Sequence, residues 1–251
     1  MKMSFLMGSA LALGLAFAMP HALQAEGGHG GWSYEGSTGP DHWGALDPAY
    51  ELCASGKNQT PVDMTGFVEA DLSPIDFKYG TPATDIVNNG HTVQINMTPG
   101  SAITIAGRTF NLIQMHFHTP SENHINGKSF AMEGHMVHAD ADGNLAVIAI
   151  LYEEGDANAR LAPFWADLPP KAGDTRPAPS GVPASSLLGD NPDYYRFNGS
   201  LTTPPCSEGV WWLVLKEPQS VSAGQVAAFM ATQPGPNNRT IQNVFARPIL
   251  R

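Results

Sequence analysis

The chain has 251 residues and a formal net charge of -10, from 23 acidic and 13 basic residues. An acidic surface of this kind repels phosphate backbones, which excludes nucleic acid as a partner. Glycine (26) and proline (21) are abundant while charged residues make up only 14%, a composition that favours a loop-rich β protein over a helical bundle.

The first 25 residues have the layout of a secretory signal peptide. Lys2 precedes an apolar run over residues 5–18, and small residues suited to cleavage end at Ala18 or Ala25. We place the cleavage after Ala25, with Ala18 as the alternative. The run is too short to span a bilayer, and no later segment approaches the ~20 apolar residues of a spanning helix. We therefore expect an exported protein, periplasmic or secreted, with one domain over residues 26–251.

Short alternating runs of apolar and polar residues dominate the middle of the chain. They predict strands, mostly joined as hairpins, over residues 93–97, 102–106, 109–118, 130–138 and 145–152. Helical periodicity is confined to residues 157–168 and 222–232, and the Pro/Gly/Ser-rich residues 171–191 predict an irregular surface loop. The pattern is that of a mainly β, single-domain protein with few short helices.

Cys53 and Cys206 are the only cysteines. An oxidising compartment favours pairing two such cysteines over leaving two free thiols. We therefore expect a structural disulfide between them.

The strand over residues 109–118 carries two different faces. Side chains of a strand alternate between its two faces. One face is therefore apolar, with Ile113, Met115 and Phe117, and the other is polar, with Gln114, His116 and His118. Two histidines two positions apart on a strand lie on the same side, where their rings can converge on one ion.

The next strand offers a third ligand. Glu133, His135 and Val137 share a face, whereas His138 points to the other side. Three neutral imidazoles suit Zn²⁺ and leave a fourth position for water, which is typical of a catalytic site. Gln114 and Glu133 are the expected acceptors that hold the rings of His116 and His135.

A cupin site is a competing interpretation of the same histidines. His116-x-His118-xxx-Glu122 fits part of the cupin metal motif and would make Glu122 a ligand. The spacing alone leaves both interpretations open.

Further motifs resemble the α-class carbonic anhydrases over about residues 32–248, and this resemblance decides against the cupin. The matching stretches include Gly39-Pro-Asp-His-Trp43, Asn58-Gln-Thr-Pro-Val-Asp63, Asn88-Asn-Gly-His91, Gln114-Met-His-Phe-His118, Glu133-Gly-His-Met-Val-His138 and Gly199-Ser-Leu-Thr-Thr-Pro-Pro-Cys206.

The resemblance implies a large, mostly antiparallel, twisted central β-sheet with short peripheral helices and zinc at the base of a cone-shaped cleft. It also implies reversible hydration of CO2 to bicarbonate and a proton, by attack of a zinc-bound hydroxide. CO2 and bicarbonate are then the small-molecule partners, and a homodimer is left open.

Carried over residue by residue, the resemblance implies that His116, His118 and His135 bind zinc. Thr202 matches the threonine that donates to a carboxylate, here Glu122, and accepts from the hydroxide. His91 matches the proton-shuttle histidine.

The same resemblance implies three further groups of residues. An apolar substrate pocket comprises Val137, Leu145, Val147, Leu201, Thr203 and Trp212. A water network leading to the shuttle comprises Tyr34, Asn89 and Gln94, and Cys53 with Cys206 matches the disulfide of exported members.

A non-catalytic zinc-binding periplasmic protein of the same fold is the alternative function. Such a protein would keep the three histidines, but histidine-rich tracts, which would favour it, are absent from the sequence, and the presence of Thr202 and Glu122 favours the enzyme.

Overall fold

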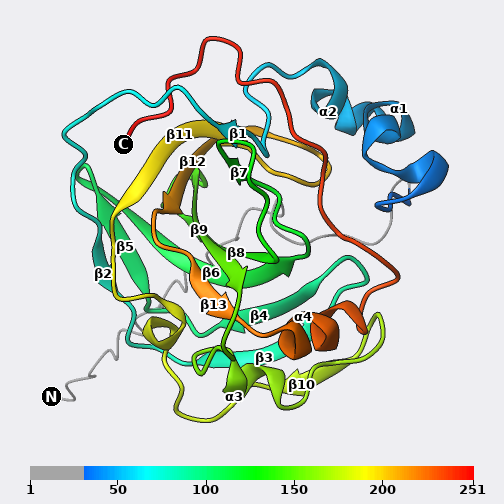
Figure 1. Ribbon diagram of the computed structural model, residues 1–251, viewed down its shortest axis with the longest axis vertical. Coiled ribbons are helices and arrows are strands. Elements are labelled where there is room, and N and C mark those ends of the chain that lie inside the picture. Colours follow the sequence, from blue (N-terminus) through cyan, green and yellow to red (C-terminus); the bar gives the residue numbers. More distant parts are fainter. Residues whose placement is uncertain (1–30) are drawn as a thin grey trace, which may run out of the picture.

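The computed structural model describes residues 31–251, so the predicted signal peptide lies outside the described residues. In this part of the chain, one large sheet holds 11 strands and a second, parallel sheet holds two (Figure 1). The strands are β1 Asp63–Met64, β2 Asp76–Lys78, β3 Ala83–Asn88, β4 Val93–Met97, β5 Ala102–Ile105, β6 Arg108–His118, β7 His124–Ile125, β8 Met132–Ala139, β9 Leu145–Glu154, β10 Thr175–Pro177, β11 Tyr194–Ser200, β12 Glu208–Leu215 and β13 Gln219–Val221.

The helices of the described residues are all short. The α-helices are α1 Trp43–Leu46, α2 Leu52–Ser55, α3 Ala162–Trp165 and α4 Ala223–Met230, and the 3₁₀ turns are Gly36–Thr38, Pro40–His42, Pro48–Tyr50 and Ala184–Leu187. Within residues 31–251, no helix has the length and apolar character needed to cross a membrane.

The large sheet is mixed but mostly antiparallel. Its main path runs β10-β3-β4-β6-β8-β9-β12-β11, with β13 beside β9 and with β2 and β5 extending from β6. Only the pairings of β9 with β12 and with β13 are parallel. The expected fold class, a mainly β protein with a large central sheet and short peripheral helices, is confirmed.

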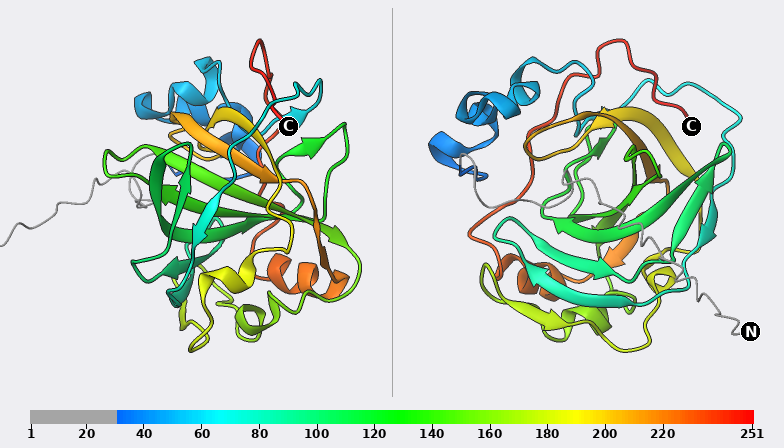
Figure 2. Two further views of the ribbon diagram at one scale, coloured as in Figure 1. Left: turned by 90° about the vertical axis from the view of Figure 1, so that its left-hand side faces the viewer. Right: turned by 180° about the vertical axis from the view of Figure 1, so that it is seen from behind.

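Apolar side chains cover both faces of the sheet, because alternate residues of the central strands point to opposite sides. One cluster includes Met132 and Met136 of β8 together with Phe164 of α3 and Phe229 of α4. Figure 2 shows α3 and α4 on one side of the molecule, with α1 and α2 on the other. The cluster on the opposite face of β8 includes Val137.

The five predicted strands are all present, with ends that shift by a few residues. The turn between β5 and β6 consists of Ala106 and Gly107, which have φ of 47° and 75°. Positive φ at both positions is typical of a type I′ hairpin turn; Gly107 adopts it at little cost, whereas Ala106 is a non-glycine residue in the left-handed region. This turn ends β5 at Ile105, one residue before the predicted end.

Ile113 is a correction. The structure has a register shift between Leu112 and Gln114 opposite β8, and the extra residue of this bulge changes the phase of the alternation. Leu112, at 3% exposure, therefore packs in the core, whereas Ile113 is only half-buried. Met115 and Phe117 are fully buried as predicted.

The predicted helix over residues 157–168 is reduced to the single turn of α3. The side chain of Asn158 accepts hydrogen bonds from the backbone of Arg160 and Leu161, a local turn that competes with helix formation. Pro163 is tolerated only in the first turn of a helix, so α3 begins just before it and no helix runs through it from residue 157. The second predicted helix is confirmed as α4.

The predicted irregular loop over residues 171–191 contains two regular elements. β10 pairs with β3 at the edge of the sheet, and a 3₁₀ turn follows over Ala184–Leu187. Pro177 is compatible with an edge strand because only one side of β10 needs hydrogen-bond donors.

Cys53 and Cys206 form the expected disulfide, with their Cα atoms 5.1 Å apart. The disulfide joins α2 to the segment that follows β11, and it packs against Trp43.

Candidate metal centre and active site

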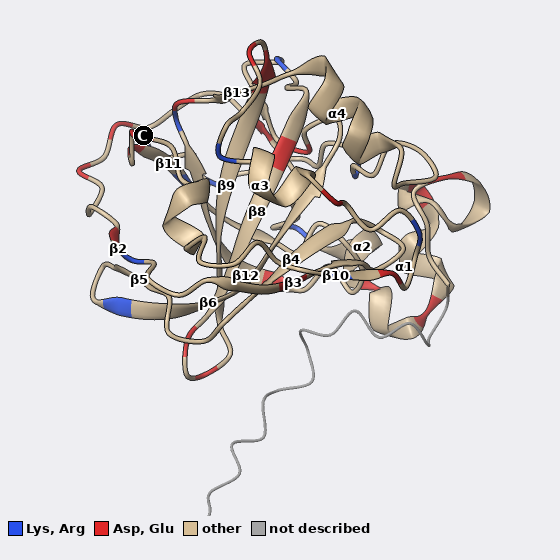
Figure 3. Ribbon diagram, turned by 90° about the horizontal axis from the view of Figure 1, so that it is seen from below, with Lys and Arg blue, Asp and Glu red and all other residues tan. Residues whose placement is uncertain are grey.

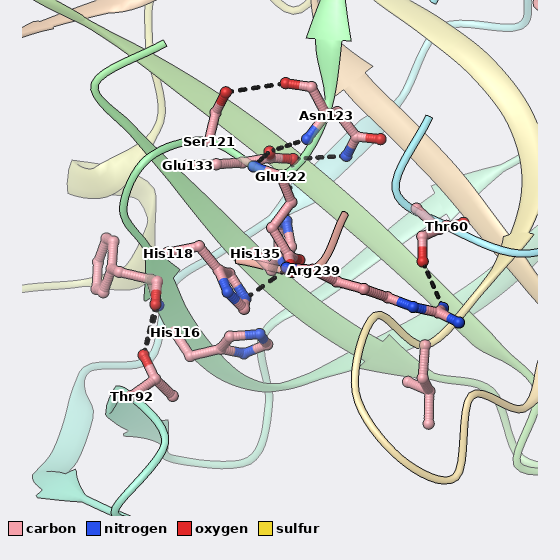
Figure 4. A network of polar contacts seen from close by, with 12 residues as sticks. Thr60, Thr92, His116, His118, Ser121, Glu122, Asn123, Glu133, His135 and Arg239 are labelled. Atoms are coloured by element: carbon pink, nitrogen blue, oxygen red, sulfur yellow. Dashed lines mark hydrogen bonds and ion pairs between the residues drawn. The ribbon is translucent and has the colours of Figure 1, made fainter. Parts of the chain in front are cut away.

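His116, His118 and His135 converge at the centre of the sheet. β6 and β8 pair antiparallel with His116 directly opposite His135, and His118 follows two residues later on the same face. One ring nitrogen from each histidine can be chosen so that all three lie within 4.8 Å of one another. Figure 4 shows the three rings gathered beside Glu122 and Arg239. The histidines that the sequence predicts as metal ligands are thus brought together.

The other nitrogen of each ring faces an acceptor. His116 Nδ1 contacts Gln114 Oε1 at 2.9 Å, His135 Nε2 contacts Glu133 Oε1 at 3.0 Å, and His118 Nδ1 contacts the Asn237 main-chain oxygen at 2.7 Å. An acceptor at one ring nitrogen places the proton there and leaves the lone pair on the other. The predicted contacts of Gln114 and Glu133 are present.

Burial keeps the three rings neutral. It lowers the pKa of His116 and His135 well below the usual value, with further lowering by the neighbouring His118. It also lowers the pKa of His118, although the Asn237 carbonyl opposes the shift. Neutral imidazole is the form that binds a metal ion.

Glu122 is a buried carboxylate beside the histidines. Its Oε1 accepts a hydrogen bond of 2.9 Å from the main-chain N–H of Arg239, and its Oε2 lies 3.5 Å from His118 Nε2. Burial raises the pKa of Glu122 well above its usual range, while the Arg239 hydrogen bond and the Thr202 side chain oppose that rise. Thr202, at 5% exposure, thus lies next to Glu122 as predicted.

The predicted apolar pocket residues lie mostly in one cluster. Val137, Val147 and Trp212 are buried, and Leu145 and Leu201 pack against them half-buried. The Trp212 ring lies 4.9 Å from the His135 ring, so this cluster borders the three histidines. Thr203 is half-buried, and its carbonyl accepts a hydrogen bond from the Cys206 backbone.

His91 follows β3 in the loop to β4 and is half-buried. Its ring stacks on Trp32, with centroids 3.7 Å apart and planes 9° from parallel. Burial lowers the pKa of His91, so the imidazole stays neutral at lower pH than a free one. Trp32 was not among the predicted site residues; its aromatic type was the only signal.

The three predicted water-network residues are placed in two groups. Tyr34 lies among Trp32 and Trp43, and burial together with the charge of Glu122 raises the pKa of its hydroxyl. Asn89 and Gln94 lie together, with Asn89 Nδ2 3.5 Å from Gln94 Oε1.

A C-terminal segment supplies contacts that sequence reasoning missed. Besides the contact to His118, Asn237 uses its side chain to bind the backbone of Thr119 and Phe117. Arg239 is 1% exposed and donates through its guanidinium to Gln59, Thr60 and Cys53. Burial lowers its pKa to about 10, so it remains a cation at neutral pH.

The histidine cluster fits a metal ion. His118 Nε2 is buried without a hydrogen-bond partner, and leaving such an atom unsatisfied is costly unless a ligand binds it. Three protein ligands are typical of a catalytic metal centre, whereas structural zinc sites use four. Fold and site together define, within residues 31–251, a β-sheet protein whose three-histidine cluster could hold a metal ion in the manner of a catalytic centre.

Known proteins share this architecture. A family model described as eukaryotic-type carbonic anhydrase matches residues 38–250. A carbonic anhydrase of Pectobacterium carotovorum is 44% identical over 219 residues, covering 87% of this chain and 90% of that protein. A carbonic anhydrase of Neisseria gonorrhoeae is 44% identical over 227 residues, covering 90% of both proteins.

Solved structures agree with these relatives. The α-carbonic anhydrase from Thermovibrio ammonificans, solved in complex with the inhibitor sulfanilamide, matches with a TM-score of 0.87 at 42% identity, covering 89% of this chain and 100% of that one. The chain therefore belongs to the α-class carbonic anhydrase family and is an enzyme of that family. This excludes the cupin interpretation, in which Glu122 would be a ligand.

Proposed function

We propose that the protein catalyses the reversible hydration of CO2 to bicarbonate and a proton, with Zn²⁺ as its cofactor. The observation that carries the proposal is the cluster of three neutral imidazoles, two buried and one half-buried, in which one nitrogen of each ring faces an acceptor and the other is left for a metal ion. Family membership supports the same reaction.

His116 and His118 would hold the zinc ion through Nε2, and His135 through Nδ1, since their other nitrogens face acceptors. Bound Zn²⁺ is a Lewis acid that lowers the pKa of water to about 7, a value for which carbonic anhydrases are themselves the reference case, and so supplies a nucleophile at neutral pH.

Thr202 would orient the attacking oxygen. In its ionised form Glu122 only accepts hydrogen bonds, and its Oε1 is already bound to the Arg239 backbone. A Thr202 hydroxyl that donates to Glu122 can only accept from a ligand in the site. The hydroxyl thereby selects the direction of the reacting lone pair.

The apolar cluster suits a small substrate without charge. The side chains of this cluster that border the histidines are apolar, as in Val137, Val147 and Trp212. The one polar atom among these three side chains, Trp212 Nε1, donates to the Ser200 carbonyl. CO2 has no net dipole, so contact with apolar side chains positions it without a desolvation cost.

His91 would carry the released proton away. An imidazole titrates near physiological pH and can exchange protons with buffer in each turnover. The lowered pKa of His91 makes the neutral, proton-accepting form available at and below neutral pH.

His118→Ala tests the metal assignment. The variant should contain no zinc after purification and should lose CO2 hydration together with the metal, measured by elemental analysis and stopped flow. His42→Ala, which removes an exposed histidine of a 3₁₀ turn, is the matched control and should retain both. A His118→Ala protein with wild-type activity would refute the assignment; zinc binding without CO2 hydration in the wild type would favour the non-catalytic alternative.

We further propose that the protein is exported, with residues 26–251 as the mature domain. The apolar N-terminal segment supports this, and the Cys53–Cys206 disulfide fits an oxidising compartment.

A further inference from the structure

A chain of side-chain hydrogen bonds begins at the backbone of His91. The N–H groups of His91 and Thr92 both donate to Asn89 Oδ1, each over 3.0 Å. Because its oxygen accepts from the backbone, Asn89 turns its amide nitrogen toward Gln94, whose Oε1 lies 3.5 Å away. The loop that carries His91 is therefore connected to β4.

The chain continues across the sheet to β3. Gln94 Nε2 donates to Asn96 Oδ1 over 2.7 Å, and Asn96 Nδ2 donates to Asp85 Oδ1 over 2.7 Å. The other carboxylate oxygen of Asp85 accepts from the Thr84 hydroxyl over 2.9 Å. Every hydrogen bond from His91 to Asp85 thus runs in the same direction.

This direction follows from the two ends of the chain. Asn and Gln side chains can each turn by 180° and exchange donor for acceptor, whereas an ionised carboxylate accepts only. Asp85 therefore obliges Asn96 to present its NH2 group to it, which leaves Asn96 Oδ1 for Gln94. At the opposite end, two backbone N–H groups fix Asn89 in the matching orientation.

Gln94 connects the hydrogen-bond chain to the strand that carries His116 and His118. In the pairing of β4 with β6, Gln94 lies directly opposite His116, and Asn96 lies opposite Gln114. Because directly opposite residues of antiparallel strands share a face of the sheet, the Gln94 amide lies on the same face as His116, and its orientation sets whether that face presents a carbonyl oxygen or an NH2 group.

We propose that Asp85 is a positioning residue for proton transfer: it fixes the Gln94 amide through Asn96, and with it the loop that carries His91. The proposal rests on the proposed function, in which His91 accepts the proton. Asp85 does not contact His91 itself and acts only through the hydrogen bonds of Asn96, Gln94 and Asn89.

Asp85→Lys tests the direction of the chain. A lysine only donates, so Asn96 turns its oxygen to the ammonium group and its NH2 to Gln94. Gln94 must then turn its own NH2 toward the nitrogen of Asn89, which leaves two donors facing each other. We expect kcat for CO2 hydration in weak buffer to fall about fivefold, the size of effect expected when one polar contact is lost. The ratio kcat/KM reports only the steps before proton release, so it should not change.

A second substitution should restore the chain. In Asp85→Lys/Asn96→Asp, the new carboxylate accepts from both the lysine and Gln94 Nε2, so Gln94 regains its orientation and kcat should recover. Asp85→Asn keeps an acceptor and should remain near wild type. Asp76→Lys introduces the same charge change on the exposed β2 and should also leave kcat unchanged.

Three results would overturn the proposal: an unchanged kcat in a folded Asp85→Lys protein, no recovery in the double variant, or an equal loss in Asp76→Lys. If Asp85→Lys fails to fold, Asn96→Leu, which removes the acceptor for Gln94 without a charge change, should show the same fall in kcat. His91→Ala, measured in parallel, separates the two proposals. If that variant shows no dependence on buffer, the shuttle itself fails; if it does and Asp85→Lys does not, only the role of Asp85 fails.

Discussion

Each imidazole of the metal centre is held by an acceptor of a different kind. Gln114 offers a neutral amide, Glu133 a carboxylate, and Asn237 a main-chain carbonyl. Glu133 also accepts from the backbone of Glu122 and Asn123, so it fixes His135 and the start of the segment that carries Glu122 together. A group that orients a ligand and is itself held in place limits how far the imidazole can rotate.

At this scale, Thr202→Ala should separate metal binding from catalysis. The Thr202 hydroxyl makes no hydrogen bond to His116, His118 or His135, so zinc content should be unchanged. CO2 hydration should fall by about 100-fold, because one preorganised hydrogen bond to the reacting group is lost. Zinc analysis and kcat/KM from stopped flow check the two halves. Thr202→Ser keeps the hydroxyl and should retain most of the activity; a Thr202→Ala enzyme with wild-type kcat/KM would contradict the orienting role.

At the scale of single elements, the sequence predicted what depends on local periodicity. β4, β6, β8 and β9 follow their alternating patterns, and the pairing of β6 with β8 brings His116 opposite His135 as expected. The bulge at Ile113 was not predictable, because it depends on how two strands pair rather than on the residues of one. The helix predicted over residues 157–168 failed for a local reason, the turn formed by Asn158.

β8 also carries a buried histidine on the face away from the metal centre. His138 contacts the Tyr79 hydroxyl through Nε2 and the Ala146 carbonyl through Nδ1. Burial lowers its pKa from 6.5 to about 4, although main-chain carbonyls oppose the shift. The folded protein therefore binds this proton less readily than the unfolded chain.

The sign of the resulting pH dependence follows. The neutral His138 contributes its full stability above pH 6.5, and that contribution is lost as the pH falls through about 4. The complete loss amounts to about 3 kcal/mol. We expect the difference in unfolding free energy between wild type and His138→Gln, measured in urea, to shrink steadily from pH 7 to pH 4.5. A difference that does not vary with pH would contradict this account of His138.

At the scale of the whole molecule, distant segments meet at one centre. His118 and Asn237 are 119 residues apart, and the main chain of Arg239 binds Glu122 from 117 residues away. The guanidinium of Arg239 also binds the carbonyl of Cys53, whose disulfide partner Cys206 follows the segment that carries Thr202. The disulfide and the buried arginine thereby connect the periphery of the fold to its active site.

Contacts over such separations explain what sequence reasoning missed. No local pattern marks residues 237–239, since their role depends on where the C-terminal segment crosses the sheet. The acidic character of the molecule was simpler to predict, since it follows from composition alone, and Figure 3 shows acidic residues spread over many segments of the described chain. A small neutral substrate requires no charged recognition surface.

CO2 hydration before and after removal of the metal tests the central claim most directly. Stopped-flow rates are measured on the purified protein, on the same protein stripped of metal by a chelator, and after addition of one equivalent of Zn²⁺. We expect activity in the first sample, loss in the second, and recovery in the third in proportion to the zinc bound. Full activity in a sample shown by elemental analysis to contain no metal would contradict the assignment of His116, His118 and His135.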